Sequence, residues 1–200
     1  MKEGNCVIAV AGASGSGKTE LVKELAKDLN GAMLFFDDYS HLMEDTREKN
    51  NTGKIDPSKL RITRMVEDIK ELLAGKMIKE PRSSRDIEPR KYIIVEDPYG
   101  RERTDIAPYY DYVILLDTPL DICLARVLLR INFWKTNNQE PIIDAKEKLV
   151  LFEKHLNGTY WTRDYYIAIN EYVRKNADII IDGMQSIETI AKEVITKIKK

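Results

Sequence analysis

The segment at residues 12–19 restricts the fold of this chain more than any other. It reads Gly-Ala-Ser-Gly-Ser-Gly-Lys-Thr and fits the pattern G-x-x-x-x-G-K-[ST] of a phosphate-binding loop. The apolar, β-branched run at residues 6–10 predicts a buried strand before it. After it, apolar side chains recur at helical spacing up to Leu29, and Asn30-Gly31 is a stop signal. A glycine-rich loop between a strand and a helix binds phosphate groups, so the sequence predicts a nucleotide site here.

Each part of this loop has an expected task. Backbone N–H groups converge on phosphate oxygens, Lys18 reaches the β- and γ-phosphates, and the Thr19 hydroxyl can bind Mg²⁺. The residues expected to hold the nucleotide are Gly12, Ala13, Ser14, Gly15, Ser16, Gly17, Lys18 and Thr19. The alternative is a flexible Gly/Ser turn without a ligand, but that interpretation leaves the placement of Lys18 unexplained.

Length and charge restrict the class of protein. Two hundred residues suit one domain, 1–200, with a substantial core. The 32 Lys and Arg and the 33 Asp and Glu give a net charge of −1, which argues against a general binder of nucleic acid or membrane surfaces. No apolar run reaches membrane-spanning length, and the early first strand leaves no room for a signal peptide, so we expect a cytoplasmic protein. Cys6 and Cys123 are expected in the core, and His41 and His155 lack the spacing of a zinc site.

Apolar strand-like runs alternate with helical patterns along the chain. Further strands are expected at residues 32–36, 92–95, 112–116 and 179–181. Because these runs are apolar throughout, they predict a parallel sheet that is covered by helices on both faces. The segment at residues 79–91 carries prolines and many charges and is expected to be exposed.

Capping and stop signals locate the helices. Asp56-Pro57 is expected to cap a helix that ends at Gly75, and Thr118-Pro119 opens one that runs to about Arg130. Residues 131–141 have little helical pattern and predict a loop. Two helices are expected after it, with a break near Asn157-Gly158, and Ser186 caps the last helix.

Acidic residues follow three of the strands. Ligands of parallel sheets bind beyond the carboxyl ends of the strands, so these side chains should face the phosphate loop. Asp37 could accept a proton from an attacking hydroxyl or hold Mg²⁺, and Glu96 could be a second acidic group near the metal. Each is also consistent with a turn or cap residue. Asp38 should point elsewhere, and Asp117 is expected to be structural.

Three arginines are candidates for contacts with the phosphates. Arg126 and Arg130 are four residues apart on one predicted helix and could clamp a triphosphate as charge develops during transfer. A solvated helix face is the alternative. Arg163 lies in the helix after the loop and could reach back over the phosphates. The tyrosines placed to flank an acceptor, because they follow strand ends, are Tyr39, Tyr99, Tyr109 and Tyr110.

These motifs together resemble the uridine kinase and phosphoribulokinase-like group of P-loop kinases. Residues 7–19 are very similar to the opening strand and phosphate loop of that group. Residues 36–39 are similar to its D-[DS]-[FY]-[FY] segment, whose first aspartate, the base, corresponds to Asp37. Residues 95–96 resemble the start of its V-E-G, residues 112–130 its fourth strand and arginine helix, and residues 177–183 its last strand.

The resemblance implies an α/β fold of the P-loop NTPase class. This fold is a three-layer sandwich with a five-stranded parallel sheet of order 2-3-1-4-5, helices on both faces, and a lid at about residues 131–141. It also implies an enzyme that uses ATP and Mg²⁺. The residues expected to act in transfer are Lys18, Asp37, Arg126, Arg130 and Arg163, and those expected near the metal are Thr19, Asp37 and Glu96.

Three departures from the group concern the acceptor. Glu96 is followed by Asp97-Pro98 rather than glycine, the lid stretch holds Lys135 but no arginine, and residues 41–56 match no nucleoside-kinase motif. The first hypothesis is a small-molecule kinase whose acceptor is a nucleoside such as uridine, with a nucleoside monophosphate or another hydroxyl metabolite still open. The second is an ATPase or nucleotide switch without a small acceptor, and the third is a binding module that has lost activity. A homo-oligomer stays open.

Overall fold

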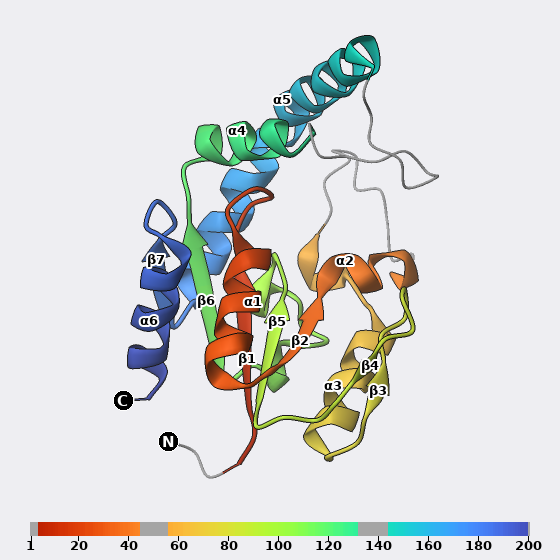
Figure 1. Cartoon of the computed structure of the whole chain (residues 1–200), viewed down its shortest axis with the longest axis vertical. Coiled ribbons are helices and arrows are strands. Elements are labelled where there is room, and N and C mark those ends of the chain that lie inside the picture. The colour runs from red at the N-terminus through yellow and green to blue at the C-terminus, as the bar shows by residue number, and fades with distance from the viewer. Residues whose placement is uncertain (1–3, 45–55, 132–143, 200) are drawn as a thin grey trace.

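The computed structural model describes residues 4–44, 56–131 and 144–199. Its centre is a parallel sheet of five strands (Figure 1), which are β1 (Cys6–Ala11), β2 (Ala32–Phe35), β5 (Tyr92–Glu96), β6 (Tyr112–Asp117) and β7 (Ile179–Asp182). Their order across the sheet is β2-β5-β1-β6-β7. β3 (Ile78–Lys79) and β4 (Asp86–Ile87) form a separate antiparallel pair. The five core strands therefore have the predicted order 2-3-1-4-5.

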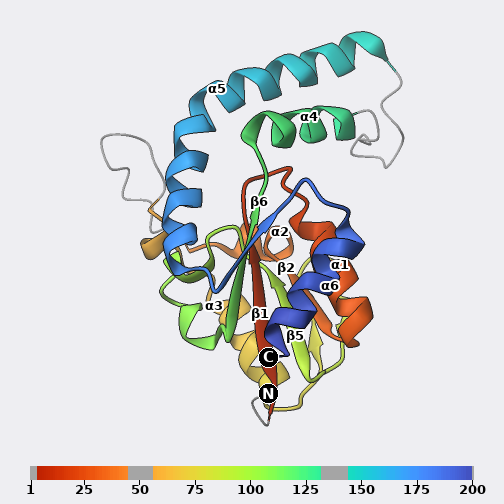
Figure 2. The ribbon, with the colours of Figure 1, turned by 90° about the vertical axis from the view of Figure 1, so that its left-hand side faces the viewer.

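Helices cover both faces of the sheet, as the uniformly apolar strands predict. On one face, α1 (Lys18–Leu29) and α6 (Ile187–Ile198) pack in one core cluster with Ile8 and Val10 of β1. On the other face, α3 (Thr63–Leu73) and the last turns of α5 (Ala145–Asn176) pack with Val7 and Ala9. Figure 2 shows these layers from the side. The predicted three-layer sandwich is confirmed.

The helix predicted to begin at Asp56 begins later, at Thr63. The Asp56 side chain does accept a hydrogen bond from Ser58 N at 3.0 Å, but it caps only a single 3₁₀ turn, Pro57–Lys59. Leu60 and Ile62 then lie in non-helical backbone and are 2% and 0% exposed. Burial of these two side chains in the core separates the turn from the helix, which local capping signals do not reveal.

The predicted break near Asn157-Gly158 is wrong, because α5 is one helix of 32 residues. A glycine inside a helix costs only about 1 kcal/mol relative to alanine, which is too little to end a long helix. α5 changes direction along its length (Figure 2). Its last part packs on the sheet, and its first part lies next to α4 (Leu120–Ile131), beyond the carboxyl ends of the strands. No described helix is both long and apolar enough to span a membrane.

The segment at residues 79–91 is not simply exposed. It contains the turn of the β3–β4 hairpin, in which Ile87 and Glu80 are 6% and 3% exposed. The Glu80 carboxylate caps the turn by accepting hydrogen bonds from Arg82 N and Ser83 N at 2.6 and 2.8 Å. The loop predicted as a lid lies, beyond Ile131, outside the described residues.

Candidate active site

The phosphate loop joins β1 to α1, and its shape depends on glycine. Gly15 has a φ of +85°, in the left-handed region that favours glycine. A Cβ at this position would lie 2.2 Å from the Cys123 carbonyl oxygen of α4. Backbone strain and close contact with α4 therefore both require glycine here.

We expect Gly15→Ala to destabilise the fold by about 2–4 kcal/mol and to abolish nucleotide binding, because both backbone strain and overpacking apply. Gly75→Ala is the matched control. Gly75 has a similar φ of +77°, but a Cβ added there would have no atom of the described residues within 4 Å, so only the backbone cost of about 1–2 kcal/mol remains. Urea unfolding of both variants measures the difference. Equal losses of stability would contradict the close contact between the loop and α4.

Ser16 connects the loop to the segment after β6. Its carbonyl oxygen accepts hydrogen bonds from Thr118 Oγ1 at 3.1 Å and from an Arg126 guanidinium nitrogen at 3.0 Å. The second terminal nitrogen of Arg126 donates to the Gly183 carbonyl at 3.1 Å. Arg126 thus holds the back of the loop against the β7–α6 connection. The pattern G-x-x-x-x-G-K-[ST] gives no indication of this support.

Lys18, Thr19 and Glu96 form one cluster at the carboxyl end of the sheet. Lys18 Nζ donates to the Ala13 carbonyl at 3.1 Å and lies 3.9 Å from Glu96 Oε1. Thr19 Oγ1 donates to Glu96 Oε2 at 2.8 Å. β1 and β5 are neighbours, and Val10 is paired with Glu96, so the sheet register places this carboxylate beside the loop.

Burial dominates the electrostatics of this cluster. It lowers the pKa of Lys18, and the charges of Glu96 and Asp37 raise it partway back. Burial also raises the pKa of Glu96, while Lys18 and the hydrogen bond from Thr19 oppose that shift and Asp37 adds to it. Asp37 is therefore close enough to act electrostatically on both partners.

Asp37 does not end a strand, because β2 stops at Phe35 and a short helix, α2 (Phe36–Tyr39), begins at the next residue. Phe36 is buried, and its ring meets the Tyr99 ring edge-on at 5.6 Å between centroids. The Asp37 side chain is exposed. Burial raises the pKa of the neighbouring Asp38, and the charge of Glu80 in the hairpin raises it further. Asp38 is therefore influenced by the hairpin, unlike the cluster of Lys18 and Glu96.

The other two arginines differ in their placement. Arg130 is exposed near the end of α4, and its charge acts on Lys18 and Glu96. Arg163 is exposed on α5, and its hydrogen-bond partner among the described residues is its neighbour Asp164, at 3.3 Å. The structure thus places Arg126 in contact with the loop, whereas Arg130 acts on its Lys18 through charge alone. Arg163 makes no contact with the loop in the described part of the chain.

Three of the four tyrosines expected to flank an acceptor are core residues. Tyr39 is 0% exposed and donates to Asp68 Oδ2 at 2.8 Å. Tyr110 is 6% exposed and donates to Asp97 Oδ2 at 2.8 Å. That expectation is wrong for Tyr39 and Tyr110, because each hydroxyl has a buried carboxylate as its partner. It is also wrong for Tyr99, which is 9% exposed and packs against the Phe36 ring.

The cluster suits a nucleotide with its magnesium ion. Mg²⁺ in phosphate sites binds through one or two carboxylates together with substrate phosphates, and Thr19 and Glu96 supply a hydroxyl and a carboxylate beside the loop. The Ser16 hydroxyl is a buried polar atom without a hydrogen-bond partner among the described residues. The described residues contain no group of three or more His, Cys, Asp or Glu side chains that could hold a metal ion.

Comparisons with known proteins identify the family and the fold. The family model described as the Phosphoribulokinase / Uridine kinase family matches residues 7–150. The chain is 30% identical over 196 residues to a uridine kinase of Haemophilus ducreyi, a match that covers 88% of this chain and 84% of that protein. It is 29% identical over 210 residues to a uridine kinase of Staphylococcus haemolyticus, with 96% and 95% covered. A solved sugar kinase from Janibacter sp. shares the fold, with a TM-score of 0.53 at 14% identity and 98% and 95% covered.

Proposed function

The chain belongs to the phosphoribulokinase/uridine kinase family, and on that premise we propose that it transfers the γ-phosphoryl group of ATP to a hydroxyl group of a nucleoside such as uridine. One observation carries the proposal. Glu96 of β5 lies beside Lys18 and Thr19 of the phosphate loop, 3.9 Å from the ammonium of Lys18 and within hydrogen-bond distance of the Thr19 hydroxyl. The uridine kinases that resemble the chain over most of its length support a nucleoside acceptor.

In this proposal the loop and its lysine bind the phosphates. The loop N–H groups and Lys18 would hold the β- and γ-phosphates. Thr19 and Glu96 would hold Mg²⁺, which when bound supplies positive charge that neutralises the phosphate oxygens. The sheet register places Glu96 beside the loop, because Glu96 is paired with Val10 of β1.

Asp37 is the proposed base. It is exposed at the start of α2, where an acceptor can reach it, whereas Glu96 is only 8% exposed and already accepts a hydrogen bond from Thr19. Asp37 orients the acceptor hydroxyl and takes its proton as the oxygen attacks phosphorus. The exposed and the buried carboxylate therefore have separate tasks.

Arg126 and Arg130 are expected to give different kinetic defects. Arg130→Gln should lower kcat by about 10²-fold, the scale for the loss of one group that stabilises developing charge. Arg126→Gln should mainly weaken nucleotide binding, because its two terminal nitrogens hold backbone carbonyls at the loop. Steady-state kinetics with varied ATP separates kcat from KM. If both variants keep full kcat and affinity, neither arginine acts in nucleotide binding or transfer, and Arg163 becomes the residue to test.

The function itself is tested by ATP turnover with and without candidate acceptors. We expect ADP release to rise several-fold when a nucleoside is added, and Glu96→Gln to remove the rise. If no small acceptor raises the rate of ATP turnover but a protein or nucleic acid does, the chain is a nucleotide switch instead.

A further inference from the structure

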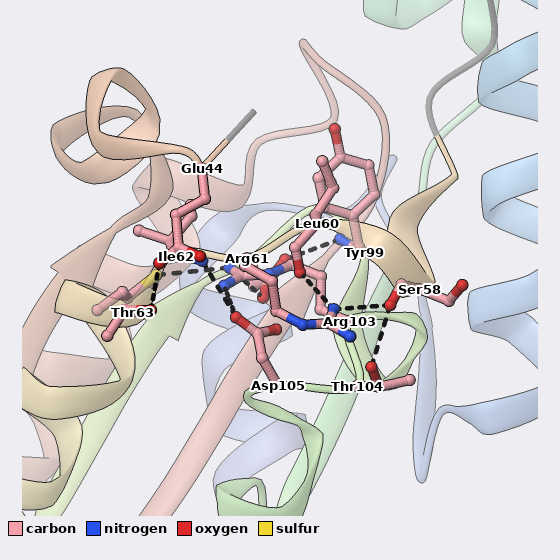
Figure 3. A network of polar contacts seen from close by, with 12 residues as sticks. Glu44, Ser58, Leu60, Arg61, Ile62, Thr63, Tyr99, Arg103, Thr104 and Asp105 are labelled. Carbon is pink, nitrogen blue, oxygen red and sulfur yellow. Dashed lines mark hydrogen bonds and ion pairs between the residues drawn. The ribbon is translucent and has the colours of Figure 1, made fainter. Parts of the chain in front are cut away.

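A buried arginine lies behind the candidate site, in the connection between β5 and β6. Arg103 is 0% exposed and is the largest fully buried side chain described. Its guanidinium donates to Asp97 Oδ2 at 3.2 Å. It also donates to Asp105 Oδ2 at 3.1 Å (Figure 3). Its central carbon lies 5.8 Å from the centroid of the Phe36 ring. One cation therefore contacts two carboxylates and an aromatic ring in the core.

Two of these partners are chain neighbours of the acidic site residues. Asp97 directly follows Glu96, and Phe36 directly precedes Asp37. β2 and β5 are adjacent in the sheet, with Phe35 paired with Glu96. Arg103 thus joins the start of α2, which carries the proposed base, to the end of β5, which carries the proposed metal ligand.

Further contacts make this junction rigid. The Asp97 carboxylate also accepts hydrogen bonds from Tyr110 Oη at 2.8 Å and from Tyr99 N at 3.0 Å. Asp97 N donates to the Val10 carbonyl at 3.1 Å, which ties it to the strand before the phosphate loop. The Phe36 ring also packs edge-on against the Tyr99 ring, which restrains Phe36.

The network extends to the start of α3. Asp105 Oδ2 accepts a hydrogen bond from Ile62 N at 3.2 Å, and the Thr104 hydroxyl donates to the Ser58 carbonyl at 3.0 Å (Figure 3). Arg103 therefore lies where β2, β5 and the segment that leads into α3 converge.

Stability alone does not account for this arrangement. Arg103 Nε and Asp105 Oδ1 are buried without a hydrogen-bond partner among the described residues. Buried ion pairs are often no more stable than apolar residues of the same volume, and unsatisfied polar atoms add a cost. What such a network provides is a fixed geometry, since its donors and acceptors fit only one arrangement.

We propose that Arg103 is a positioning residue that fixes Asp37 and Glu96 relative to each other, through Phe36 and Asp97. This inference rests on the proposed function of those two carboxylates. Arg103 itself is fully buried, so it acts through its neighbours Phe36 and Asp97. Its effect should be seen in the rate of transfer, because displacing a reacting group by about 1 Å can cost about 10²-fold.

The test replaces the pair and not the arginine alone, because a single change would leave a charge unpaired in the core. Asp97→Asn with Arg103→Met removes the fully buried pair and keeps an oxygen that can accept from Tyr110. Asp105, whose side chain is 10% exposed, keeps its hydrogen bond from Ile62 N. The matched control is Arg101→Met with Asp178→Asn. These two residues form an ion pair at 2.7 Å, and Arg101 lies in the same β5–β6 connection as Arg103. Among the described contacts, this pair has none with Phe36 or Asp97. For each variant we would measure the melting temperature, nucleotide affinity, kcat and KM for the acceptor, and a crystal structure.

We expect the Asp97/Arg103 double variant to fold and bind nucleotide like wild type, with kcat at least about 10-fold lower and the carboxylates of Asp37 and Glu96 displaced in the crystal. The control pair should keep kcat. Wild-type kcat in the folded double variant, or unmoved carboxylates, would overturn the proposal, and so would an equal loss of kcat in both pairs. If the double variant does not fold, Phe36→Leu replaces it, because this change removes the ring beside the guanidinium and leaves the charges in place. The same loss of kcat would support the proposal, and wild-type kcat would overturn it. Lack of transfer by the wild type would instead refute the proposed function, while the crystal structures would still decide the positioning role.

Discussion

Replacing Lys18 with alanine is expected to abolish phosphoryl transfer, with a fall in kcat on the order of 10³-fold or more, and to weaken ATP binding. Lys18 is the one cation that the loop motif places at the β- and γ-phosphates, and in the structure its ammonium is held by the Ala13 carbonyl beside Glu96. The fold should survive, because burial of this ammonium is unfavourable, as its lowered pKa indicates, and alanine is the best helix former at the start of α1. Turnover and thermal melting measure the two effects.

Lys23→Ala on the same helix is the control for this variant. Lys23 is exposed and pairs with Glu20 at 2.7 Å on the surface, where such a pair contributes little. Its removal should change neither turnover nor melting temperature appreciably. Wild-type turnover in Lys18→Ala would contradict the assignment of residues 12–19 as the donor site.

Asp37→Asn is expected to leave ATP binding intact and to lower transfer to the acceptor by at least about 10²-fold, the usual scale for a positioned general base. The substitution keeps the size of the side chain and removes its charge, while Lys18 and the loop are untouched. A fluorescent ATP analogue reports binding, and a coupled assay reports transfer. Because Asp37 is exposed at the start of α2, the change should not disturb the core.

Asp38→Asn is the matched control, since its side chain is half-buried and is influenced by Glu80 of the hairpin. It should reduce transfer much less than Asp37→Asn. Unchanged transfer in Asp37→Asn would exclude this base and direct attention to Glu96. Loss of nucleotide binding in that variant would instead identify Asp37 as a ligand of the metal.

The sheet and the phosphate loop are predictable from local sequence. The five core strands are short apolar runs whose side chains are buried on both faces, so their pattern alone indicates a covered parallel sheet. The strand order itself came from the resemblance. The placement of Glu96 beside the loop follows from the same sheet, because a carboxylate at the end of β5 must lie next to the end of β1.

Helix boundaries were harder to predict because tertiary packing overrides local signals. Asp56-Pro57 is a sound cap, yet burial of Leu60 and Ile62 limits it to one turn. Gly158 is a weak helix breaker inside a helix that packs against α4 at one end and the sheet at the other.

The Arg103 network could not be predicted from the sequence. Arg103 lies in a run of charged residues that is typical of an exposed loop, and only the fold brings it to Phe36. The one sequence signal is Asp97, which stands where the uridine kinase and phosphoribulokinase-like group has glycine. In the structure this departure is the buried partner of Arg103.

Phosphorus NMR of a mixture of the protein, ATP, Mg²⁺ and uridine tests the central claim most directly. Transfer to a hydroxyl group converts ATP to ADP and creates one phosphomonoester for each ADP formed. We expect a new phosphomonoester resonance on the nucleoside that grows in step with ADP and is absent with Lys18→Ala. If uridine and every other nucleoside tried give ADP and inorganic phosphate but no phosphomonoester, the protein is not the nucleoside kinase proposed here.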